Sequence, residues 1–138
     1  MSNIKIIKPL KGHNIFSDVF KVAYKKRSSK LLIAYTYYSK ENSADNLFLG
    51  VSVPKKIVKK AVCRNRIKRL LRESIRQVKI EEIELIKEIN QLILVWQETL
   101  EHPSRLRLNT VKEEMKNLLN SALIKKNETD INSNNKII

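Results

Sequence analysis

The side chains best suited to chemistry in this chain are basic ones, which recur at short intervals between residues 64 and 76. Arginine presents a planar fork of donors that matches phosphate oxygens two at a time and also stacks on nucleobases. These residues therefore predict the binding of a phosphate polymer and not the breaking of bonds. The set is Arg64, Asn65, Arg66, Lys68, Arg69, Arg72 and Arg76.

A helix over residues 61–78 is predicted to position these side chains. At 100° per residue, one set of side chains falls within about 100° and gives an apolar face: Cys63, Ile67, Leu70, Leu71, Ser74 and Val78. A polar set falls within about 100° on the opposite face: Asn65, Lys68, Arg69, Arg72 and Arg76. Like charges four residues apart destabilise a helix, as at Lys68–Arg72 and Arg72–Arg76, and Glu73 lies off this face. Their presence predicts an anionic partner, and nucleic acid is the favoured one.

The charge of the whole chain is concentrated in the same segment. The 138 residues carry 28 Lys and Arg against 14 Asp and Glu, a net charge of +14. Residues 53–79 hold eleven basic residues and one acidic residue, Glu73, whereas residues 80–138 hold eight basic and ten acidic residues. A coding bias towards lysine would be spread evenly, so the clustering indicates a surface that neutralises phosphates.

Several other classes of protein are disfavoured. The single cysteine, Cys63, excludes an internal disulfide and a cysteine-based zinc site. No apolar run reaches the roughly 18 residues of a membrane span, and the N-terminus lacks a secretory signal, so we expect a cytoplasmic protein with no membrane partner. A protein-only ribonuclease could use His13 and His102 as base and acid, but two histidines 89 residues apart are more typical of surface positions.

The remaining elements follow from periodicity and turn signals. We expect an irregular start over 1–12, a polar loop or edge strand over 24–30, a turn over 40–46 and a helical segment over 79–90. One domain over 1–126 is predicted, with a disordered tail over 127–138. The expected regular elements are helix 13–22, strands 31–39, 47–53 and 92–96, and helix 104–126.

Two stretches, Gly50–Ile57 and Lys60–Glu73, resemble the protein component of bacterial ribonuclease P. The triplet Arg64-Asn65-Arg66, followed by Ile67-Lys68-Arg69, matches the most specific motif of that family. Phe16 and Val19-Phe20 lie at the distance expected for its first helix. The resemblance covers roughly residues 8–78 by motif and 90–125 only by pattern and length.

This resemblance implies a fold and a function. The implied fold is an α/β (α+β) two-layer sandwich with a mixed sheet and the order α-β-β-β-α-β-α. The implied partners are ribonuclease P RNA, one protein per RNA, and precursor tRNA, whose 5′ leader the complex removes. The protein is then the accessory subunit of an endoribonuclease whose RNA carries out the catalysis, with Mg²⁺ held by the RNA and none by the protein. The alternative is a structural RNA-binding protein such as a ribosomal protein, which would share the size and charge.

The resemblance also assigns site residues. Phe16, Phe20 and Tyr35 match positions that bind the leader, where aromatic rings stack on unpaired bases. Core packing is the alternative for Phe20, and Arg64, about 60° from Ile67, is close enough to the apolar face for a structural role. The positions that match contacts to the catalytic RNA are Arg64, Asn65, Arg66, Lys68, Arg69 and Arg72, with Lys55 and Lys56 after the second strand.

Overall fold

The computed structural model describes residues 5–38 and 45–137, with side chains as far as Ile124 apart from that of His13. From the N-terminus, the elements are β1 (Ile6–Pro9), α1 (His13–Val22), β2 (Tyr24–Arg27), β3 (Leu31–Tyr37), β4 (Asn46–Ser52), α2 (Ala61–Glu81), η1 (Ile83–Leu85), β5 (Ile89–Trp96), η2 (Pro103–Arg105) and α3 (Leu108–Ile137). The expected order α-β-β-β-α-β-α is present from α1 to α3.

The five strands form one mixed sheet in the order β1-β4-β5-β3-β2. β4 runs parallel to both β1 and β5, whereas β3 is antiparallel to β5 and β2. β5 lies at the centre, and its Leu92, Ile93 and Leu94 are fully buried. This confirms the expectation that the continuous apolar run 92–96 is a strand covered on both faces.

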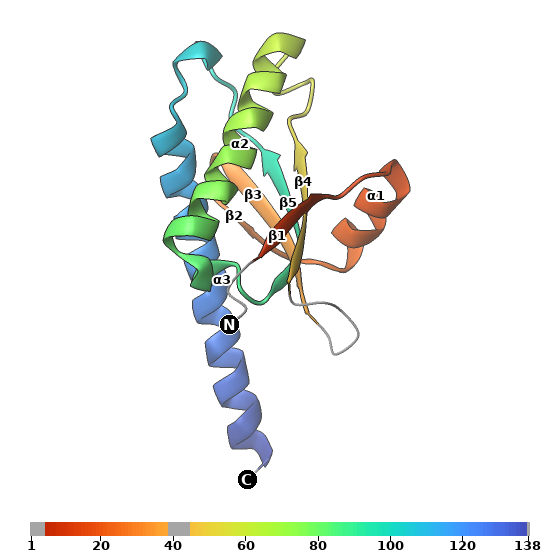
Figure 1. The fold of residues 1–138 in the computed structure, drawn as a ribbon, viewed down its shortest axis with the longest axis vertical. Helices are drawn as coiled ribbons and strands as arrows, with labels where there is room; N and C mark the ends of the chain where they lie inside the picture. The colour runs from red at the N-terminus through yellow and green to blue at the C-terminus, as the bar shows by residue number, and fades with distance from the viewer. Residues whose placement is uncertain (1–4, 39–44, 138) are drawn as a thin grey trace.

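The two faces of the sheet pack against different helices (Figure 1). Ile33 and Tyr35 of β3 belong to the main core with α2 and α3, whereas Ala34 between them packs with Val19 of α1. Successive side chains of a strand point to opposite faces, so this alternation separates the two cores. As a result, α2 and α3 lie on one face and α1 lies on the other.

α2 packs on the sheet by the apolar face that its sequence predicts, together with Ile75, which was not in the predicted set. Ile67, Leu71, Ile75 and Val78 are fully buried. Ser74 is buried among them, and its hydroxyl donates a hydrogen bond to the Leu70 carbonyl at 2.8 Å. The mixed sheet and the packing of the arginine-bearing helix on it are therefore confirmed.

The expectation that residues 1–12 are irregular is wrong, because Ile6–Pro9 forms the edge strand β1. Four residues ending in proline give little local strand signal, and the strand depends on hydrogen bonds to a distant neighbour. Leu10 N donates to the Leu49 carbonyl at 2.9 Å, and Ile6 N donates to the Asp45 carbonyl at 2.6 Å. β1 is thus held by β4, about 40 residues along the chain.

Other boundaries also differ from expectation, and the last helix, expected over 104–126, is α3 over Leu108–Ile137. α2 continues to Glu81, η1 follows, and β5 begins at Ile89, so residues 79–90 divide among three elements. The expected turn over 40–46 lies mostly outside the described residues, and the boundary between a domain 1–126 and a tail 127–138 stays a prediction. Within the described ranges, no helix is both long and apolar enough to span a membrane.

Candidate nucleic-acid interface

The solvent side of α2 carries the predicted basic stripe. Asn65, Arg69 and Arg72 are exposed, and Lys68 is half-buried. Among the described residues, Lys68, Arg69 and Arg72 form no ion pair. Their charges are therefore available to neutralise phosphates at the surface.

Arg76 differs from its neighbours on the stripe. Its guanidinium donates to the Glu73 carboxylate at 2.7 Å, and the arginine side chain is 66% exposed. The expectation that Arg72 and Arg76 repel each other without relief is therefore wrong in part, because Glu73 reaches the stripe from one turn earlier. An exposed pair of this kind contributes little to stability and is readily exchanged for a phosphate.

Arg64 and Arg66 bind the protein's own backbone instead of pointing to solvent. Arg64 Nη1 donates to the carbonyls of Val58 at 3.1 Å and Lys59 at 2.7 Å. Arg66 Nη1 donates to the Pro103 carbonyl at 3.1 Å, which ties α2 to η2. The motif therefore divides into two arginines that hold the scaffold and one asparagine, Asn65, that is exposed. Helical periodicity alone does not predict the contact of Arg66 with the Pro103 carbonyl.

Lys55 and Lys56 are both exposed in the turn that leads from β4 to α2. The turn is anchored below them, since Val58 is 4% exposed and its N–H donates to the Pro54 carbonyl at 3.0 Å. Arg64 binds the same turn from α2. The lysine pair and the α2 stripe are thus fixed relative to each other.

Phe16 and Phe20 lie on the other face of the sheet, where both are partly buried against Val19 and Ala34. A Cβ at Gly50 would lie 3.0 Å from Phe16 Cε2, so the absence of a side chain lets this ring approach β4. Lys25 Nζ lies 4.8 Å from the centroid of the Phe20 ring. Both rings therefore serve partly as core and stay partly exposed, and that of Phe20 lies beside a cation.

An open cavity of about 360 Å³ lies on this same side of the molecule. β1, the loop before α1, α1, β4 and β5 all contribute to it. Its lining residues are Pro9, Leu10, Lys11, Ile15, Phe48 and Gln91. Phe48 and Gln91 are sheet residues that sequence reasoning did not single out; strand alternation places Phe48 on the face opposite Leu47 and Leu49.

The structure does not bring Tyr35 together with Phe16 and Phe20. Tyr35 is 3% exposed in the core under α3, on the opposite face of the sheet. Its ring centroid lies 5.9 Å from that of Tyr24 and 5.7 Å from that of Tyr37, and burial raises the pKa of both Tyr35 and Tyr37. Tyr24, 62% exposed, is the accessible member of this cluster and was not predicted. A leader-binding role for Tyr35 stays a prediction, without a shared cleft to support it.

The structure describes only one of the two histidine side chains that a protein-only ribonuclease could use as base and acid. His102 is exposed immediately before η2, and the side chain of His13 lies outside the described part of the chain. Within the described ranges, no three His, Cys, Asp or Glu side chains are grouped as a metal site would require.

Comparison with known proteins gives consistent findings. The family model described as Ribonuclease P matches residues 7–123. The ribonuclease P protein component of Aliivibrio salmonicida is 43% identical over 61 residues, which cover 44% of this chain and 49% of the relative. That of Clostridium kluyveri is 48% identical over 60 residues, which cover 41% and 50%. The matched part of the chain thus spans about half the length of these curated relatives.

Two solved structures share the fold. The ribonuclease P protein of Staphylococcus aureus has a TM-score of 0.63 at 22% identity, covering 83% of this chain and 94% of that one. The ribonuclease P protein of Thermotoga maritima has a TM-score of 0.63 at 24% identity, covering 81% and 94%. The sheet and its three helices are therefore an arrangement seen in solved proteins.

Proposed function

Since the chain belongs to the ribonuclease P protein family, we propose that it is the protein component of a ribonuclease P. In this proposal it binds the catalytic RNA and the 5′ leader of precursor tRNA and assists the endonucleolytic removal of the leader. The RNA carries out the cleavage with its own Mg²⁺, and the protein contributes binding. It acts in the cytoplasm, with one protein per RNA.

The observation that carries the proposal is the one-sided character of α2. One face of this helix is fully buried on the sheet through Ile67 and Leu71, and the other presents Arg69 and Arg72 to solvent. Such a helix can neutralise phosphates of a folded RNA while its position stays fixed by the core. Lys55 and Lys56, held beside it, extend the same surface.

The leader is assigned to the opposite face, beside α1. Phe16 and Phe20 can stack on unpaired bases, and Lys25 lies close enough to Phe20 to meet an adjacent phosphate. Two RNA partners on two faces of one sheet explain how a small protein can bring a catalytic RNA and its substrate together.

The RNA that the protein binds in the cell tests this proposal. A tagged chain expressed in its own host is predicted to co-purify with one RNA of a few hundred nucleotides that cleaves precursor tRNA. Co-purification of ribosomal RNA alone would show instead that the chain is a structural component of the ribosome. A chain carrying Arg69→Ala and Arg72→Ala is the control and should lose the bound RNA.

A further inference from the structure

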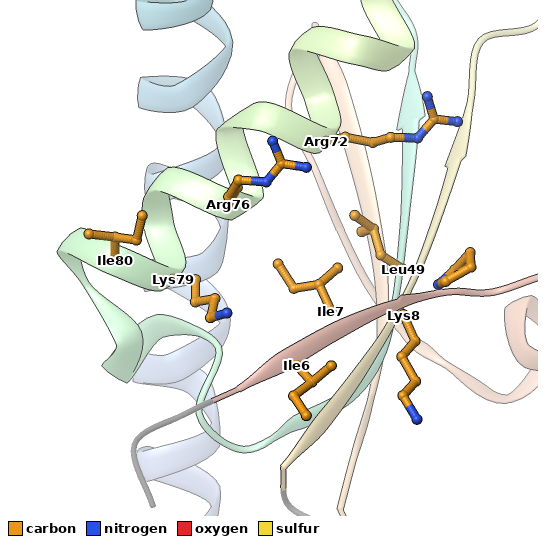
Figure 2. A pocket seen from close by; sticks show the side chains of 9 residues that line it. Ile6, Ile7, Lys8, Leu49, Arg72, Arg76, Lys79 and Ile80 are labelled. Atoms are coloured by element: carbon orange, nitrogen blue, oxygen red, sulfur yellow. The ribbon is translucent and has the colours of Figure 1, made fainter.

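A second groove lies between β1, β4 and the C-terminal half of α2, with a volume of about 580 Å³ (Figure 2). Its wall is basic and is formed by Arg72, Arg76 and Lys79 of α2. Its floor is apolar, with Leu49 of β4 and Ile7 of β1, which points towards α2. The volume falls within the range of sites that enclose small ligands.

Two exposed isoleucines flank this groove. Ile6 is 49% exposed and Ile80 is 77% exposed, and both belong to its lining. Single exposed apolar residues are ordinary, but here two of them belong to the lining of a hollow that also has an apolar floor, beside a basic wall. The ligand must therefore offer apolar faces and negative charge together.

The cations are spaced along one helix and meet a single carboxylate. Arg72, Arg76 and Lys79 rise in steps of about 6 Å and about 4.5 Å along the axis of α2. Glu73 binds Arg76 from the side and is the acidic group that contacts this wall among the described residues. The net positive charge and the predominance of arginine favour phosphate groups.

The outer edge of β1 makes an acidic peptide an unfavourable ligand for this groove. The amides of Ile6 and Leu10 point to β4, so alternation places those of Ile7 and Pro9 on the outer edge. Proline has no N–H, and the outer edge of β1 therefore offers one donor, from Ile7. A peptide strand that adds to a sheet depends on a row of such donors, whereas a nucleotide chain does not.

We propose that this groove binds an unpaired segment of the catalytic RNA, with phosphates on Arg72, Arg76 and Lys79 and a base against Ile7 and Ile80. The charge and the apolar lining of the groove favour a nucleotide strand as its ligand. The further claim that this strand belongs to the catalytic RNA rests on the proposed function, in which the same helix contacts that RNA. The leader is assigned to the other face of the sheet, where α1 lies (Figure 1).

Binding of fluorescein-labelled hexauridylate to the free protein tests the groove. Ile80→Glu places a negative charge at its rim and is expected to weaken binding by about tenfold or more. Arg76→Gln should reduce the slope of log K against log salt by about 0.7. Ile124→Glu is the matched control, because Ile124 is an exposed helical isoleucine of α3, outside the groove.

Equal affinities of the Ile80→Glu and Ile124→Glu proteins, both folded by circular dichroism, would overturn the proposal. The proposal would also be overturned, in favour of an acidic peptide, if hexaglutamate bound more tightly than hexauridylate and the Ile80→Glu protein lost this binding of hexaglutamate. Both measurements use the protein without its RNA, so their outcome does not depend on the proposed function.

A tethered cleavage reagent identifies the source of the RNA. In the reconstituted holoenzyme, Ile80→Cys in a Cys63→Ala background carries an iron chelate that cuts nearby nucleotides. Cleavage in an unpaired part of the catalytic RNA is expected. Cleavage in the leader alone, or none in either RNA, would overturn the proposal, while cleavage of precursor tRNA by the same complex would leave the proposed function standing.

Discussion

Arg64 and Arg69 lie five residues apart on one helix, yet their surroundings give them different tasks. Arg64 donates to two backbone carbonyls of the turn before α2, whereas Arg69 is exposed without an ion pair in the described structure. The arginines of this helix thus combine anchoring of the helix with an exposed cation that the proposed function assigns to RNA. Charge alone does not tell the two apart, because both side chains carry the same guanidinium.

Replacing these two arginines should separate stability from binding. Arg69→Ala is expected to weaken binding of the catalytic RNA and leave the free energy of unfolding within about 0.5 kcal/mol, as for an exposed side chain. Arg64→Ala should lower that free energy by about 1 kcal/mol, because two hydrogen bonds to backbone carbonyls are lost at a half-buried site. Urea unfolding and RNA titration at fixed salt measure the two effects. Unchanged RNA affinity in the Arg69→Ala protein would contradict the assignment of the stripe.

Phe16 is the residue that tests the leader surface. Phe16→Ala is expected to reduce the advantage in affinity that a long leader gives to precursor tRNA, because one stacking ring beside the sheet is lost. Affinity for mature tRNA should not change. Titration of the holoenzyme with both RNAs provides the comparison, and equal losses for both would show that Phe16 acts as core alone.

Gly50 is required by the close approach of that ring. Gly50→Ala puts a methyl group 3.0 Å from Phe16 Cε2, which should cost about 1–3 kcal/mol of stability as overpacking. The smaller side chain of Phe16→Leu should recover part of the loss in the double variant, as thermal unfolding of the single and double variants would reveal. Additive losses would mean that the two residues do not press on each other.

At the scale of elements, the sequence predicts correctly the two helices whose apolar residues recur at helical spacing, α1 and α2. α1 begins and ends at the expected residues, and α2 buries the predicted stripe because five apolar side chains and Ser74 recur at helical spacing. β1 was missed because its pairing with β4 comes from residues about 40 positions away. Tyr35 was grouped with Phe16 by the family resemblance, and the sequence alone does not show which face of the sheet α1 covers.

β1 is held at its start by the buried cation Lys5. Its Nζ donates to the Lys87 carbonyl at 2.6 Å and lies 3.9 Å from the centroid of the Tyr38 ring. Burial lowers the pKa of Lys5 to about 8, against smaller opposing effects of Asp45 and Glu88. Burial likewise raises the pKa of Tyr38 to about 12.

These shifts predict how stability depends on pH. Between about pH 8 and 10.5 the unfolded chain keeps a proton on Lys5 that the folded chain has released, so the free energy of unfolding should rise with pH. Above about pH 10 the unfolded tyrosines lose protons that the folded Tyr37 and Tyr38 keep, so stability should fall again. Urea titrations from pH 7 to 11 measure the curve. Lys5→Met should lack the rising part, and a flat curve in the unmodified protein would contradict the burial of this lysine.

At the scale of the whole molecule, the net charge of +14 resolves into distinct surfaces. The α2 stripe and the lysine pair lie with the groove under β1 on one side of the sheet, and the aromatic rings of α1 lie on the other. The acidic residues are concentrated after residue 80, where Glu81 binds Lys112 at 3.2 Å and Lys116 at 3.0 Å and so joins α2 to α3. The C-terminal part is therefore a scaffold, and the basic excess lies on the surfaces that the proposed function assigns to RNA.

The most direct test is cleavage of precursor tRNA by the cognate catalytic RNA at a low Mg²⁺ concentration, with and without this protein. We predict that the RNA alone is nearly inactive under these conditions, and that adding one equivalent of the protein restores removal of the 5′ leader. The Arg69→Ala, Arg72→Ala protein should restore it only at higher protein concentration, because fewer phosphates are neutralised. If the unmodified protein binds the RNA but leaves cleavage at the level of the RNA alone, the account is contradicted.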